Sequence, residues 1–70
     1  MNDSKAYVDR RGWTYRVMPG LGGNTFKARY CKPGATNWKC VSYLPWRDTA
    51  EKAQADLDEA AHTRGWEATA

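Results

Sequence analysis

The chain has 70 residues, a net charge of +3, and an apolar inventory that relies on four Trp, four Tyr and one Phe. It is long enough for one small domain, which buries only about 60% of the surface of its unfolded chain and leaves little room for an active-site cleft. No segment approaches the roughly 20 apolar residues that span a membrane, and no basic start precedes an apolar stretch, so we expect a cytoplasmic protein without a secretory signal.

Residues 1–9 are polar and are expected to form a disordered lead. A single domain is expected over residues 10–66, followed by a frayed tail over residues 67–70. The first expected strand covers residues 13–18, where apolar side chains alternate with others at a period of two. A turn rich in Gly, Pro and Asn at residues 19–24 ends this strand.

Two further strands are expected at residues 25–31 and 38–44, where the same alternation continues. The turn at residues 32–37 separates them, and Pro45 ends the third strand because proline cannot donate to a central ladder. Short turns between successive strands indicate an antiparallel sheet.

The turn positions set the expected strand register. A first hairpin centred near residue 21 places Val17 opposite Phe26, and a second hairpin centred near residue 35 places Cys31 opposite Cys40. Both hairpins sort the side chains in the same way, which matters because a slip of one residue would invert a strand. One face then holds Trp13, Tyr15, Val17, Phe26, Ala28, Tyr30, Val41 and Tyr43. The other face holds Thr14, Arg16, Lys27, Arg29, Trp38, Cys40 and Ser42.

A helix is expected from about residue 50 to residue 64, with Asp48 or Thr49 as its N-cap. Small and apolar residues, mostly alanine, recur along it at helical spacing, so one stripe of the helix is suited to close packing on the apolar face of the sheet. Gly65 is placed to end the helix in a left-handed turn. The expected fold is therefore α+β: a three-stranded antiparallel sheet packed on one C-terminal helix (βββα), with its second face open.

The basic residues gather in the strand region. Residues 10–47 carry eight Lys or Arg and no Asp or Glu, whereas residues 48–70 carry six acids against two bases. Such a split indicates a side that faces a polyanion and a side that faces solvent. On the open face, cations suit phosphates and base edges, and an aromatic ring suits sugars and bases. A solvated sheet face is the alternative for any one of these cations.

Arg10 and Arg11 precede the first strand. They are expected either to reach a phosphate backbone or a minor groove as a flexible arm, or to be only a solvated lead-in to the strand. The expected nucleic-acid contacts are Arg16, Lys27, Arg29, Trp38, Lys39, Arg10 and Arg11.

No catalytic or metal-binding constellation is evident. Cys31 and Cys40 provide two ligands and His62 a distant third, where a structural zinc site needs four. The two cysteines are either reduced thiols or a cross-strand disulfide, and His62 is expected to be an exposed residue near the helix end. We therefore expect no enzyme, no metal, no cofactor and no small-molecule substrate.

The segment TAEKAQADLDEAA at residues 49–61, followed by RGW, resembles the helix of the plant ethylene-response-factor DNA-binding domain. The segments YRV at residues 15–17 and FKAR at residues 26–29, together with Trp38, are similar to that family's strand pattern. The same fold occurs in the arm-site DNA-binding domains of phage and transposon tyrosine recombinases. In both, the three-stranded sheet enters the major groove and its open face contacts DNA. The resemblance covers residues 10–66 and implies contacts from Arg16, Lys27, Arg29 and Trp38.

This resemblance implies a small stand-alone protein, from a phage or another mobile element, that binds double-stranded DNA through the open face of its sheet. The alternative is a protein-interaction module or a homodimer, in which Trp38 and Trp46 form the contact surface and arginines surround it.

Overall fold

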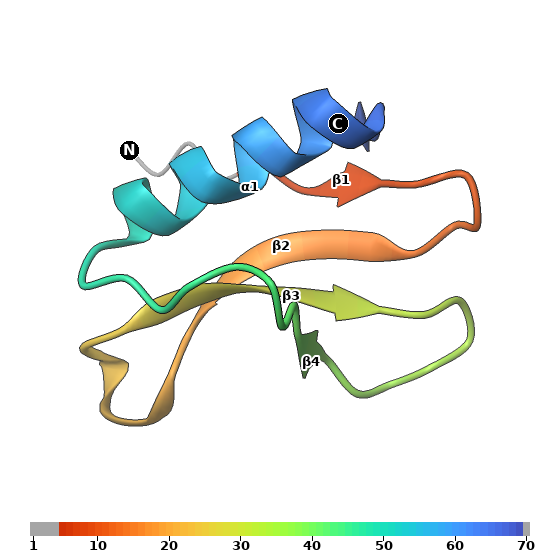
Figure 1. Cartoon of the computed structure of the whole chain (residues 1–70). Helices are drawn as coiled ribbons and strands as arrows, with labels where there is room; N and C mark the ends of the chain where they lie inside the picture. The colour runs from red at the N-terminus through yellow and green to blue at the C-terminus, as the bar shows by residue number, and fades with distance from the viewer. Residues whose placement is uncertain (1–4, 70) are drawn as a thin grey trace.

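The computed structural model describes residues 5–69. It contains one antiparallel sheet in the strand order β4-β3-β2-β1-β5, with a single helix, α1, packed against β2 and β3 (Figure 1). In chain order the elements are β1 (Tyr7–Val8), β2 (Thr14–Pro19), the 3₁₀ turn η1 (Leu21–Gly23), β3 (Phe26–Cys31), β4 (Lys39–Cys40), α1 (Ala50–Arg64) and β5 (Glu67–Ala68). The α+β class and the C-terminal helix are confirmed, whereas the sheet has five strands rather than three.

The two additional strands lie where a disordered lead and a frayed tail were expected, so those expectations are wrong for the paired residues. Tyr7 of β1 pairs with Tyr15 of β2 and with Ala68 of β5, which joins the two ends of the chain. The physical reason is the Tyr7 side chain, which is buried and donates a hydrogen bond of 2.6 Å from its hydroxyl to Asp58 of α1. Residues 1–4 and 70 lie outside the described part of the chain.

The β2–β3 hairpin is shifted by two residues from the predicted register. Val17 lies opposite Ala28 rather than Phe26. Gly22 and Gly23 both adopt positive φ, at 83° and 72°, and the chain reverses one residue later than expected. Because the shift is an even number, every side chain of the hairpin stays on its predicted face.

The second hairpin shifts by the same amount. Arg29 lies opposite Cys40, so Cys31 does not face Cys40, and both cysteines are free thiols. The third strand is also shorter than predicted, because the chain turns away after Cys40 as Val41 enters the core. The backbone N–H of Val41 still donates to Ala28 at 3.0 Å, and the chain returns to β3 at Arg47.

The helix is capped at both ends by residues that the sequence indicated. Thr49 is the N-cap, since its hydroxyl accepts a hydrogen bond of 3.1 Å from the backbone N–H of Lys52. Gly65 ends the helix with φ of 75°, and the N–H of Trp66 donates to Ala61 at 2.9 Å. No helix among residues 5–69 is long and apolar enough to cross a membrane. The buried core consists of Tyr7, Tyr15, Ala28, Val41, Ala53, Leu57 and Ala61.

Candidate nucleic-acid interface

The open face is the side of the sheet away from α1 (Figure 1). Its cations come from the sequences of β2 and β3. The alternation that turns Tyr15 and Ala28 into the core turns their neighbours outward. Trp38 joins them from the residue before β4, with its ring centroid 5.9 Å from the guanidinium carbon of Arg16. The structure thus brings together four of the predicted contacts: Arg16, Lys27, Arg29 and Trp38.

Two arginines stand side by side on this face. Arg16 of β2 lies directly opposite Arg29 of β3, an arrangement of like charges that weakens a sheet. The Nε atom of Arg29 is buried and has no hydrogen-bond partner. Within residues 5–69 no ion pair involves an open-face cation, since the pairs join Arg11 to Asp9, Arg47 to Asp56 and Lys52 to Asp48.

Trp46 extends the open face beside Lys27. The amino group of Lys27 lies 5.4 Å from the centroid of the Trp46 ring, and Trp46 is 47% exposed. The ring packs over Gly20, where a Cβ atom would lie 2.7 Å from it. The sequence singled out Trp46 as an exposed ring, and the structure adds its position next to a cation.

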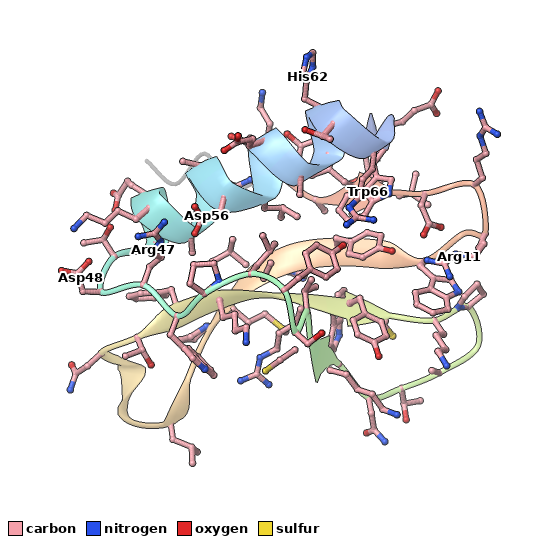
Figure 2. All side chains as sticks on the ribbon, in the orientation of Figure 1. Arg11, Arg47, Asp48, Asp56, His62 and Trp66 are labelled. Atoms are coloured by element: carbon pink, nitrogen blue, oxygen red, sulfur yellow. The ribbon has the colours of Figure 1, made fainter. Side chains whose placement is uncertain are left out.

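The other three predicted contacts lie elsewhere. Lys39 is opposite Tyr30 and therefore on the helix side of the sheet. Arg11 is held in place at the β1–β2 turn (Figure 2), because its Nη2 lies 2.9 Å from Asp9 and its guanidinium carbon lies 3.6 Å from the Trp13 ring centroid. Arg10, in the same turn, lines a cleft on the helix side.

The Asp9 carboxylate organises this turn. It accepts hydrogen bonds from the backbone N–H groups of Arg11 at 2.8 Å and Trp13 at 3.0 Å, and from the hydroxyl of Tyr15 at 2.7 Å. Burial acts to raise the pKa of Asp9, but the hydrogen bonds from Tyr15 and Arg11 outweigh it and lower the pKa. Burial, and then the bond to Asp9, raise the pKa of Tyr15 to about 12. Arg11 is therefore part of a fixed turn and not of a flexible arm.

The three candidate metal ligands, Cys31, Cys40 and His62, are not grouped together in the structure. His62 points away from the sheet on the exposed side of α1 (Figure 2), whereas Cys31 and Cys40 belong to β3 and β4. Among the described residues, no three His, Cys, Asp or Glu side chains are grouped as a metal site requires.

No family model, no curated protein and no solved structure matches this chain.

Proposed function

We propose that this protein binds double-stranded DNA through the open face of its sheet. The observation that carries the proposal is the cross-strand pair of Arg16 and Arg29, two like charges held side by side without an acid to separate them. Such a pair costs stability in the free protein, and a phosphate backbone would remove that cost by neutralising both guanidinium groups.

The shape of this surface also supports the proposal. The β2–β3 hairpin is the longest part of the sheet, and a two-stranded ribbon fits the major groove of B-form DNA. Its guanidinium groups suit both phosphate oxygens and the edge of guanine, because their donors form a planar fork. Trp38 and Trp46 border the cations and offer apolar contact to sugars.

Duplex binding at several salt concentrations tests this function. Fluorescence anisotropy with a labelled duplex of about 20 base pairs should show binding by the wild type at low salt. Arg29→Ala should weaken that binding and reduce the salt slope by about 0.9, the contribution of one phosphate contact. Lys52→Ala is the matched control, because it removes an exposed cation of α1 that already pairs with Asp48. Equal losses in the two variants, or no binding by the wild type, would contradict the proposal.

A homodimer through the same face is the competing function, and the exposure of Trp46 favours it. Sedimentation of the free protein decides between the two. A concentration-dependent dimer that Trp46→Ala abolishes, together with no binding to duplex DNA, would assign the face to protein contact.

A further inference from the structure

A second surface lies on the helix side of the sheet. The β1–β2 turn, the segment at residues 40–43 and the end of α1 border an open cleft of about 660 Å³, which we call the aromatic cleft. Figure 2 shows Trp66 in this region, between the end of α1 and β2. The rings that line the cleft are those of Trp13, Tyr15, Tyr30, Tyr43 and Trp66.

Most of these rings are fixed by stacking. Tyr15 and Trp66 stack with centroids 3.8 Å apart and planes 9° apart, and Trp13 stacks on Tyr30 at 5.2 Å and 11°. Tyr43 differs, because it is 52% exposed and stacks on no other ring within residues 5–69. The guanidinium carbon of Arg64 lies 4.4 Å from the centroid of its ring. The cleft thus combines a preformed aromatic wall with one ring that a ligand can reach.

The charged side chains on the walls of the cleft favour an anionic ligand. Arg10, Arg11 and Arg64 line it, and among the described residues on its walls Asp9 is the one acid. Asp9 is already engaged, since its oxygens accept hydrogen bonds from Tyr15 and Arg11 and its side chain is only 7% exposed. A cationic ligand would find no free carboxylate among the described residues of the cleft. An anionic ligand meets the guanidinium groups of Arg10 and Arg64, which form no ion pair within residues 5–69.

We propose that the aromatic cleft binds an unpaired nucleotide. The base stacks on the face of the Tyr43 ring that Arg64 does not cover, and Arg10 and Arg64 hold the phosphate. Stacking on aromatic side chains accepts any base, and guanidinium groups bind phosphate through paired N–H donors. The nucleotide is either a free mononucleotide or part of a single strand. Because the cleft and the open face lie on opposite sides of the sheet, this site does not depend on the proposed binding of duplex DNA.

The four tryptophans provide separate reporters for the two surfaces. Trp13 and Trp66 line the cleft, whereas Trp38 and Trp46 adjoin the cations of the open face. In ¹H–¹⁵N spectra of the indole groups, adenosine 5′-monophosphate should shift the signals of Trp13 and Trp66 and leave the other two in place. Adenosine should bind more weakly, and inorganic phosphate alone should not shift them.

Variants of the cleft make the test specific. Tyr43→Ala should weaken mononucleotide binding about tenfold, whereas Tyr43→Phe, which keeps the ring, should bind like the wild type. Arg64→Gln should also weaken binding, and it keeps the test decisive if Tyr43→Ala does not fold. Leu21→Ala is the control, because Leu21 is fully exposed in the η1 turn.

A short single-stranded oligonucleotide separates the two sources of the nucleotide. Binding at least about tenfold tighter than that of the mononucleotide would identify a strand as the ligand, because several phosphates then contribute. Similar affinities would identify a free nucleotide. The site is overturned if the signals of Trp13 and Trp66 do not move, if phosphate alone moves them equally, or if neither Tyr43→Ala nor Arg64→Gln changes the affinity.

Discussion

Among residues 5–69, Lys and Arg side chains contact aromatic rings in five pairs and carboxylates in three. A ring holds a cation in place through its quadrupole without cancelling the charge, so the cation stays available to a phosphate. Acids neutralise Arg11, Arg47 and Lys52. Aromatic rings contact Arg16 and Lys27 on the open face and Arg64 at the aromatic cleft, whereas Arg29 and Arg10 have no such contact among the described residues. The pairs are Arg11 and Lys32 with Trp13, Arg16 with Trp38, Lys27 with Trp46 and Arg64 with Tyr43.

Replacing Arg16 should stabilise the free protein. Arg16→Gln removes one of two like charges that face each other across β2 and β3, so the free energy of unfolding at low salt should rise by roughly 0.5 kcal/mol. Salt screens the repulsion between Arg16 and Arg29 in the wild type. The difference in free energy of unfolding between Arg16→Gln and the wild type should therefore shrink at high salt. Thermal unfolding followed by circular dichroism at two salt concentrations measures both effects.

Arg11→Gln is the matched control for this experiment. It removes a guanidinium group that pairs with Asp9, so it should not stabilise the protein. A lower stability of Arg16→Gln at low salt would contradict this prediction, because it would mean that the contact of Arg16 with the Trp38 ring outweighs the repulsion from Arg29.

Asp9→Ala should lower the stability of the protein more than is usual for a substitution in a turn. The change leaves the Tyr15 hydroxyl and two backbone N–H groups without their acceptor, at a cost of about 2 kcal/mol at neutral pH. Folding lowers the pKa of Asp9, so its carboxylate stabilises the fold above the usual value of 3.8. That contribution is lost as the pH falls through the lower folded-state pKa.

Urea unfolding followed by tryptophan fluorescence, at neutral pH and in acid, measures this pH dependence. The wild type and Asp9→Ala should converge as the pH drops, because protonation takes the charge from the wild-type carboxylate. A difference between them that stays constant across the whole range would contradict an ionised Asp9 in the folded protein.

At the scale of the elements, the N-terminus of α1 offers two neighbouring residues that differ in role. Thr49 accepts the hydrogen bond from the N–H of Lys52, whereas Asp48 is 3.0 Å from the Lys52 amino group at the exposed surface. Thr49→Ala should therefore lower the free energy of unfolding by about 1 kcal/mol. Asp48→Ala should leave it almost unchanged, since exposed ion pairs contribute little. Chemical denaturation of the two variants compares them, and a larger loss in Asp48→Ala would identify Asp48 as the cap.

The period of two explains why the open face was predictable from the sequence although the register was not. Both hairpins are shifted by two residues, so Arg16, Lys27 and Arg29 kept their face while their partners changed. The turns decided the shift, because the positive φ of Gly22 and Gly23 depends on a loop geometry that alternation does not encode.

The elements that the sequence did not reveal depend on contacts between its distant parts. β1 and β5 have two residues each, too few to show a period, and the bond from Tyr7 to Asp58 joins residues 51 positions apart. The aromatic cleft has the same origin. Trp66 meets Tyr15 only because Gly65 turns the chain back at the end of α1. The one sign of this cleft in the sequence was the number of aromatic residues, four Trp, four Tyr and one Phe in a chain of 70 residues.

At the scale of the whole molecule, the basic stretch at residues 10–47 divides between two surfaces. Arg16, Lys27 and Arg29 lie on the open face. Three others lie on the helix side: Arg10 at the cleft, Lys32 with its amino group 5.0 Å from the centroid of the Trp13 ring, and Lys39 opposite Tyr30. Two triple variants, each of which removes three positive charges from one surface, compare the contributions of the two surfaces to DNA binding. The open-face variant is Arg16→Ala, Lys27→Ala and Arg29→Ala; the helix-side variant is Arg10→Ala, Lys32→Ala and Lys39→Ala.

If duplex DNA contacts only the open face, the open-face variant should reduce the slope of log affinity against log salt by about three, close to one per lost phosphate contact. The helix-side variant should keep the wild-type slope and lose only the weak attraction of distant charge, which salt screens beyond about 10 Å. Equal reductions in the two variants would mean that the protein attracts DNA through its overall charge. The placement of the basic residues on one face of the sheet or the other would then not matter for binding. A diffuse attraction depends on the number of cations and not on the face that carries them.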